Sequence, residues 1–580
     1  MCVENLEKIL LSVQRPARYT GGEVNSVVKD VQNISLRFAF AFPDIYDIGM
    51  SHLGLKILYS LINSREGYWC ERVFMPLPDM AEKMREHNIP LYALESGQAI
   101  RDFDIIGFTL QYELSYTTIL AMLDLAGIPV LKSDRGCDFP LIIAGGPCAC
   151  NPEPLCDFID LFVIGEGEEV TFELLDLYNK CDNREDFLGK AALIDGIYVP
   201  DISKTTKKRI IADLDNIFYP KEFIVPFIET VHDRAVTEVL RGCIRGCRFC
   251  QAGFTCRPYR EKPRGKILNE TMDLCKSTGY DEVSLCSLST SDYSDIEQLL
   301  KDLTEYTDNN KINLSLPSLR IDKFNDEVLR RIKSIRKSGL TFAPEAGTQR
   351  LRNVINKNIT EENILTGCRI AFSGGYSSVK LYFMLGLPTE TDEDIIAIYK
   401  LTEKIMRLYK EISVARKGIS VSISLGTFVP KPFTPFQYEP MISREQADKR
   451  QKLFMSLVKS GKVKVSRSDY SMSLLEAVFA RGDRRLGKVI HSAFKNGCVL
   501  DAWNDYFDYE KWEKAFREHN ITPEEYACRS YDYNEPLPWG NIDMSVSEEF
   551  LVRENKRAHS EQTTPNCREA CTKCGLNCEG

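Results

Sequence analysis

The stretch Arg241-Gly-Cys243-Ile-Arg-Gly-Cys247-Arg-Phe249-Cys250 follows a short apolar segment that ends at Leu240. Its cysteines have the spacing C-x3-C-x2-C. Three thiolates on one short loop suit three irons of a cubane cluster, because neighbouring ligands reach three corners without a long excursion of the chain. The fourth iron is then left without a protein ligand, and an open metal position is what substrate chemistry requires.

Zinc is the competing interpretation of this loop. Structural zinc takes four ligands, commonly from two paired hairpins, and no fourth Cys or His stands at the expected place nearby. Cys256 follows the loop and is the one nearby cysteine that could be taken for a fourth ligand. The spacing therefore favours a [4Fe–4S] cluster held by Cys243, Cys247 and Cys250.

Strand-like and helix-like segments alternate on either side of the loop, from about residue 235 to about 436. The strand candidates are Ala235–Leu240, Glu282–Cys286, Asn313–Leu316, Leu340–Ala343, Ser378–Met384 and Ser420–Phe428. Six strand–helix repeats predict a partial (β/α)6 barrel of the TIM-barrel-like kind. Chemistry on such a barrel is expected at the carboxyl ends of the strands.

A second alternating region precedes the barrel, in residues 35–195. Its short apolar strands end in glycine turns such as Gly145-Gly146-Pro147 and Gly165-Glu166-Gly167-Glu168. This pattern predicts an open, parallel, Rossmann-like sheet. Ligands of such sheets bind at the carboxyl ends of the strands, where these glycine loops lie.

The remaining segments complete an α/β protein of several parts. We expect an N-terminal extension over 1–34, a connector over 196–230, the partial barrel over 231–440, a helical region over 441–545 and a cysteine-rich tail over 546–580. The tail carries Cys567, Cys571, Cys574 and Cys578. A short tail is too small to form a hydrophobic core, so a bound metal would be needed to hold it in one structure. Zinc and a second iron–sulfur cluster both fit, and a flexible redox-active tail is the alternative.

The bulk composition indicates a cytoplasmic protein. No stretch approaches the length of apolar sequence that spans a membrane, and the N-terminus is acidic where a secretory signal is basic. Twenty cysteines in a reducing compartment point to metal rather than to disulfides. The net charge of −9 gives no global attraction to nucleic acid.

The cysteine loop and the segments after it resemble the radical S-adenosylmethionine (SAM) superfamily. C-x3-C-x-aromatic-C after a first strand is the signature of that family. Further segments resemble successive elements of its methylthiotransferase-like and cobalamin-type branches, over roughly residues 35–440. These segments are 283–293, 316–322, 341–348, 382–391 and 428–437. The layout also resembles a subgroup of undetermined function that ends in a cysteine tail.

The resemblance implies a chemistry and a set of cofactor contacts. The open iron binds the amino and carboxylate groups of SAM, and an electron from the cluster cleaves the sulfonium to give a 5′-deoxyadenosyl radical. A flavodoxin- or ferredoxin-type donor supplies that electron. The expected cofactor-binding residues are Phe249 near the adenine, Ser318 and Arg320 at the ribose or carboxylate, Glu345 at the amino or ribose groups, and Gly386 in the Gly-Leu-Pro element. A helix cap is the alternative for Glu345, and no catalytic residue is assigned.

The N-terminal region resembles the cobalamin-binding domain that precedes many such barrels. A base-off cobalamin site usually takes an axial His from Asp-x-His-x-x-Gly. Around His52 the chain reads Met50-Ser-His52-Leu-Gly54, which lacks the Asp and has the Gly one position early. We therefore expect His52 to be an ordinary residue at a helix start. Cobalamin is a candidate cofactor, and a vestigial or substrate-recruiting domain is the alternative.

Two interpretations of a basic stretch, residues 241–266, stay open. Eight Arg or Lys and one acid, Glu261, lie between Arg241 and Lys266. They either neutralise the cluster and SAM, or bind RNA or a ribonucleoprotein by phosphate neutralisation.

The expected reaction is radical methylation or methylthiolation. A methylthiotransferase usually carries three further cluster cysteines, and Cys148, Cys150 and Cys156 match that pattern poorly. The rival from another class is a non-catalytic iron–sulfur or zinc protein that binds a partner and needs no SAM site.

Overall fold

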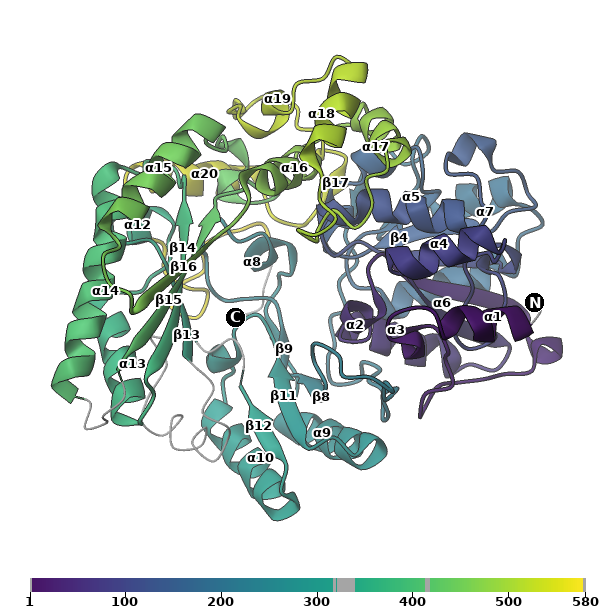
Figure 1. Ribbon diagram of the computed structural model, residues 1–580, viewed down its shortest axis with the longest axis horizontal. Coiled ribbons are helices and arrows are strands. Elements are labelled where there is room, and N and C mark those ends of the chain that lie inside the picture. The colour runs from purple at the N-terminus through teal and green to yellow at the C-terminus, as the bar shows by residue number, and fades with distance from the viewer. Residues whose placement is uncertain (1–2, 317–319, 321–339, 413–417, 577–580) are drawn as a thin grey trace.

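The computed structural model describes residues 3–316, 320, 340–412 and 418–576. Two α/β units lie side by side, and helices from the C-terminal part of the chain run across the top of both (Figure 1). The predicted α/β class is confirmed. Within the described ranges, no helix has the length and apolar character needed to cross a membrane.

The N-terminal unit is an open sheet with strand order β2-β1-β3-β4-β5-β6. Its strands are β1 (Leu36–Phe42), β2 (Tyr68–Phe74), β3 (Ile105–Thr109), β4 (Leu141–Gly145), β5 (Leu161–Val163) and β6 (Ile197–Tyr198). All neighbours are parallel except β5 and β6. Every residue of the first three strands is buried, because helices cover both faces. The strand order reverses between β1 and β3, which is the switch point where ligands of such sheets bind.

Helices connect these strands, and the N-terminal extension is attached to them. The helices are α1 (Val3–Leu10), α2 (Tyr46–Gly49), α3 (Leu53–Asn63), α4 (Pro78–Glu86), α5 (Tyr116–Leu125), α6 (Glu168–Tyr178) and α7 (Arg184–Ala191). Glu23 of the extension pairs with Arg72 of β2 at 2.7 Å, and both side chains are almost fully buried. The extension is therefore part of this unit, because breaking a buried pair of this kind leaves an uncompensated charge.

The barrel consists of two parallel sheets. The first contains β8 (Ala235–Glu238), β11 (Glu282–Cys286) and β12 (Asn313–Ser315), and the second contains β13 (Leu340–Glu345), β14 (Ser378–Leu385), β15 (Ser420–Thr427) and β16 (Val463–Arg467). Side chains from both sheets share one apolar core. The predicted partial barrel is confirmed, and all six expected strands are present.

The barrel helices are α9 (Arg264–Thr278), α10 (Ile296–Asn310), α12 (Gln349–Val354), α13 (Glu361–Ser373), α14 (Asp392–Ile412) and α15 (Arg444–Leu457). β16 was not expected. It pairs with β15 and continues the second sheet beyond residue 440, where the sequence predicts only helices. β16 is an edge strand whose residues after Val463 are mostly exposed, and so it lacks the apolar alternation that reveals a strand in sequence.

The C-terminal helical region does not form a core of its own. It comprises α16 (Tyr470–Ala480), α17 (Leu486–Lys495), α18 (Tyr509–Glu518), α19 (Glu524–Ala527) and α20 (Glu548–His559). Trp512 and Phe516 belong to the same buried core as the strands of the N-terminal sheet. A short strand, β17 (Ile542–Asp543), pairs with β7 (Thr206–Lys207) of the connector. The helical region therefore completes the N-terminal unit.

Asp501 is a buried carboxylate at this junction. Thr117 of α5 donates to Asp501 Oδ2 at 2.6 Å, and Asp501 is 0% exposed. Burial raises the pKa of Asp501 to about 6, although the Thr117 hydroxyl and Lys511 act in the opposite direction. The charged form is thus disfavoured in the folded chain.

We expect the stability of the wild type to fall as the pH rises from about 4 to about 6, because the folded chain retains a proton that the unfolded chain has lost. Asp501→Asn should remove that dependence and stabilise the protein at pH 8 by up to about 3 kcal/mol. The difference in thermal midpoint between variant and wild type, measured from pH 4 to 8, tests this. A difference that does not change with pH would show that Asp501 is not protonated in the fold.

Candidate active site at the cysteine loop

The three cysteines lie on a loop between two short elements of the barrel. The loop begins after β9 (Leu240–Arg241), which pairs with β10 (Arg260–Glu261), and it runs into α8 (Ala252–Thr255). Gly242 has a φ of 79°, and a Cβ there would lie 2.5 Å from the carbonyl oxygen of Pro258. Only glycine allows the loop to leave the strand at this point.

The three thiols are half-buried, as a protected but reachable cluster requires. Burial raises the pKa of Cys243 to about 11 and that of Cys250 to about 12. No group of three His, Cys, Asp or Glu side chains in the described part of the chain converges on a single ion. A cubane cluster does not need such convergence, because each cysteine binds a different iron. The donor set and its spacing therefore fit a [4Fe–4S] cluster better than a lone zinc ion.

A cation, a carboxylate and an aromatic ring meet beside this loop. Lys357 Nζ lies 3.1 Å from Glu345 Oε1 and 5.9 Å from the centroid of the Phe249 ring. Arg320 Nη2 donates to the carbonyl oxygen of Lys357 at 3.1 Å. Three of the predicted SAM contacts, Phe249, Arg320 and Glu345, are thus gathered around Lys357. Ser318 lies outside the described residues.

Lys357 itself was missed by the sequence analysis. Its side chain is 12% exposed, and burial alone would lower its pKa, but the Glu345 carboxylate reverses that effect and the pKa is raised. Asn356 and Asn358 on either side both have a φ of 51°. Paired asparagines of this kind indicate a tight turn, and this was the only local signal available.

Gly386 has a structural role at the end of β14. Its φ is 86°, and its amide donates to Glu390 Oε2 at 2.8 Å. Arg450 Nε pairs with the same carboxylate at 3.1 Å. Burial raises the pKa of Glu390 to about 7. The Gly386 amide is therefore already bound, so the predicted contact of Gly386 with SAM would have to come from its other backbone atoms.

The Arg and Lys side chains of the basic stretch are bound by other residues of this chain. Seven of its eight cations pair with carboxylates, and the eighth, Arg257, donates to the carbonyl oxygen of Gly253. The pairs are Arg241 with Glu168, Arg245 with Asp292, Arg248 with Glu554, Arg260 with Glu166, Arg264 with Asp295, and Lys262 and Lys266 with Glu270. Because these charges are compensated, the stretch no longer argues for RNA binding.

Two of these pairs join the domains. Arg260 Nη2 lies 2.6 Å from Glu166 Oε1, and Arg241 binds Glu168. Both carboxylates belong to the glycine loop after β5. On the other side of the interface, Lys431 Nζ lies 2.6 Å from Glu113 Oε1 in the turn after β3. The carboxyl ends of the N-terminal sheet and of the barrel strands therefore meet next to the cysteine loop.

Several residues at the edge of the N-terminal sheet are already engaged. His52 caps α3 by accepting a hydrogen bond from the Leu55 amide at 3.1 Å, and burial lowers its pKa to about 4. At the switch point, Trp503 Nε1 donates to Asp44 Oδ1 at 2.9 Å, and Tyr112 binds the same carboxylate.

The glycine loop is also covered, since a Cβ at Gly165 would lie 2.2 Å from the carbonyl oxygen of Arg209 in the connector. These residues do not fit a His-ligated cobalamin, so no step is assigned to that cofactor.

The tail lies against the cysteine loop. The Cys567 amide donates to the carbonyl oxygen of Ile244, between the first two cluster cysteines, at 3.0 Å. Cys571 is exposed, whereas Cys574 is buried and its carbonyl oxygen accepts from the Ser547 amide at 2.8 Å. Cys578 lies outside the described residues. The predicted tail metal stays a prediction.

The chain matches known proteins over most of its length. Residues 54–200 match the family "Radical SAM proteins, N-terminal", and residues 237–402 match the "Radical SAM superfamily". An uncharacterized protein of Methanocaldococcus jannaschii is 30% identical over 505 residues, which are 83% of this chain and 98% of that relative.

Of two further matches, one covers only part of each chain and the other is a likeness of fold alone. The tRNA-2-methylthio-N(6)-dimethylallyladenosine synthase of Thermotoga petrophila is 28% identical over 207 residues, which are 33% of this chain and 46% of that enzyme. The structure of the radical SAM methyltransferase TsrM from Kitasatospora setae, with cobalamin and a [4Fe–4S] cluster bound, has a TM-score of 0.54 at 12% identity. It covers 84% of this chain and 99% of that chain, so most of this chain has a similar fold.

Lys357→Met should weaken SAM binding about tenfold, or about 1.4 kcal/mol, because it removes the ammonium and leaves Glu345 unpaired. Calorimetric titration of the anaerobically reconstituted protein with SAM measures this. Lys404→Met, on the outer surface of α14, is the matched control and should bind as the wild type does. Equal affinity of all three proteins, at equal iron content, would place Lys357 outside the SAM site.

Proposed function

The chain belongs to the radical SAM superfamily, and from that premise we propose that it methylates an unidentified substrate at the site formed by the cysteine loop and Lys357. The observation that supports this most directly is the grouping of Phe249, Glu345 and Lys357 beside a loop of three half-buried thiols. When bound, the cluster supplies one electron that breaks the S–C5′ bond of SAM, which yields methionine and the 5′-deoxyadenosyl radical. That radical would take a hydrogen atom from the substrate and leave as 5′-deoxyadenosine. A second SAM, with a second electron from the donor, would supply the methyl group and leave as S-adenosylhomocysteine.

The residues of the site suit the groups of SAM. The Lys357 ammonium is complementary to the SAM carboxylate, and the Glu345 carboxylate is complementary to its amino group or ribose hydroxyls. The half-buried Phe249 ring offers a face to the adenine. A non-catalytic metal protein would need none of these groups in one place, so the arrangement favours the enzyme over that rival.

Methylation is favoured over methylthiolation. Methylthiolation in this family uses a second cluster held by three more cysteines. Cys148 and Cys150 lie buried in the turn after β4, but Cys156 Sγ donates to the carbonyl oxygen of Pro152 within its own turn. Burial raises the pKa of all three thiols. Their spacing also matches the pattern of that second cluster poorly.

The partners and the compartment follow from this chemistry. A flavodoxin- or ferredoxin-type protein supplies the electron, and a cytoplasmic location fits a thiolate-held cluster and twenty cysteines. RNA remains a candidate substrate only because a relative named for a tRNA modification is 28% identical over 207 residues.

Anaerobically reconstituted protein should form 5′-deoxyadenosine from SAM on addition of dithionite, whereas a variant with Cys243, Cys247 and Cys250 changed to Ala should form none. The three substitutions remove the cluster that donates the electron. Mass spectrometry of the reaction mixture measures the product. A wild type that holds a cluster but binds no SAM would overturn the assignment and favour the partner-binding rival.

The tail provides a separate prediction. Changing Cys567, Cys571, Cys574 and Cys578 to Ser should remove the zinc or the iron of the tail and leave the iron of the cysteine loop in place. Metal analysis of both proteins, together with the electronic spectrum of the loop cluster, measures this. Identical metal content would show that the tail holds no metal.

A further inference from the structure

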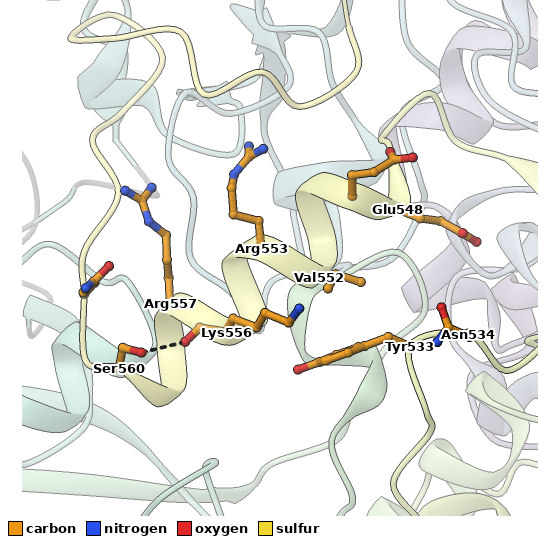
Figure 2. A pocket seen from close by; sticks show the side chains of 10 residues that line it. Tyr533, Asn534, Glu548, Val552, Arg553, Lys556, Arg557 and Ser560 are labelled. Carbon is orange, nitrogen blue, oxygen red and sulfur yellow. Dashed lines mark hydrogen bonds between the residues drawn. The ribbon is translucent and has the colours of Figure 1, made fainter.

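A cleft of about 710 Å³ lies on the outer side of α20. Figure 2 shows Arg553 and Arg557 one helical turn apart on this helix, and Lys556 extended toward Tyr533. Val552 and Ser560 line the same side of α20. These positions repeat at helical spacing, so they form one face of the helix.

The opposite face of α20 contacts the cysteine loop. Glu554, which is 2% exposed, pairs with Arg248 between the second and third cluster cysteines, with Nη2 and Oε2 3.0 Å apart. The Phe550 ring lies 6.1 Å from the ring of Phe254 in α8, directly after the loop. A single helix, roughly 10–12 Å across, therefore separates the cleft from the loop.

The charge of the cleft differs from that of the whole chain. Arg553 and Lys556 are exposed, and Arg557 is partly exposed. Several contacts hold these residues in place. Arg557 Nη1 pairs with Glu554 Oε1 at 3.5 Å. Arg553 Nη2 donates to the carbonyl oxygen of Thr572 in the tail at 2.5 Å, and Lys556 Nζ lies 5.2 Å from the Tyr533 ring centroid. The net charge of the chain is −9, so three cations on one side of α20 are a local concentration of positive charge that an acidic protein would meet favourably, toward the end of the helix away from Glu548 and Glu549.

We propose that this face of α20 is the docking surface for the acidic protein that reduces the cluster. The proposal rests on the proposed function, because a cluster that cleaves SAM consumes an electron each time and so needs a donor. One electron leaves the donor, which is oxidised, and reduces the cluster. The cluster then passes it to the sulfonium of SAM, where the S–C5′ bond breaks and the cluster is oxidised again.

The composition of the cleft favours a protein over a nucleic acid. Glu548 and Glu549 line one end of it and would repel phosphates and acidic side chains alike, so they do not distinguish the two partners. Tyr533 and Val552 add aromatic and apolar surface, which with arginine is typical of protein interfaces. Complexes for electron transfer are small and transient, so a surface of this size is sufficient.

Lys556→Glu tests the proposal, with Lys556→Gln as a milder version of the same change. The reduced donor is a flavodoxin supplied with its reductase and NADPH. We expect the rate of 5′-deoxyadenosine formation with flavodoxin to fall about tenfold in Lys556→Glu and less in Lys556→Gln, while the rate with dithionite stays at the wild-type level. Calorimetric titration with oxidised flavodoxin at low salt should show the same order of affinities, independently of turnover.

Lys190→Glu, on α7 at the far side of the N-terminal unit (Figure 1), is the matched control and should behave as the wild type. Wild-type rates and affinities for both Lys556 variants would overturn the docking surface. So would a loss of affinity for an RNA oligonucleotide with unchanged affinity for flavodoxin, because the cleft would then serve nucleic acid. A wild type that gives no product with dithionite would overturn the proposed function instead, and the titration would still decide the docking surface.

Discussion

Arg248 stands between two of the three cysteines of the loop, and its side chain is fully buried. Its guanidinium binds Glu554 of α20 and donates to the carbonyl oxygens of Val354 and Gln562. One side chain therefore ties the cysteine loop to the barrel, to the C-terminal helix and to the tail. Removing one partner of such a buried pair costs about 3–5 kcal/mol, so the position of the loop depends on this contact.

Ion pairs also determine how the two units meet. The same basic stretch that carries the cysteines provides Arg241 and Arg260, which bind the glycine loop of the N-terminal sheet. Lys431 and Glu113 join the carboxyl ends of the second barrel sheet and of β3. The edge at which each parallel sheet would bind a ligand is thus turned toward the other unit and toward the cysteine loop. A substrate held between the units would lie close to the site of radical formation.

The C-terminal part of the chain has two roles in this arrangement. Its helices α16 to α18 complete the core of the N-terminal unit, and Trp503 fills the switch point of that sheet through Asp44. Its last helix and the tail instead cover the cysteine loop, with α20 against Arg248 and the Cys567 amide against Ile244. The same segment therefore holds the two units together and forms the outer wall of the site.

The sequence by itself determined the elements that local patterns encode. The spacing of Cys243, Cys247 and Cys250 predicted a cluster loop, because thiolates on one short loop can reach three irons of one cluster. Short apolar strands that end in glycine turns identified both parallel sheets, since burial on two faces requires continuous apolar runs. His52 was correctly expected at a helix start, because its surroundings lack the axial-ligand motif.

Only the tertiary structure decided which side chains meet. Lys357 joins Glu345 and Phe249 across separate elements, and Arg248 meets Glu554 from 306 residues away. The basic stretch looked like a surface for phosphates because its carboxylate partners, such as Glu166, lie in distant segments. No periodicity or spacing in the sequence indicates such pairings, since they depend on how the helices and sheets pack once they have formed.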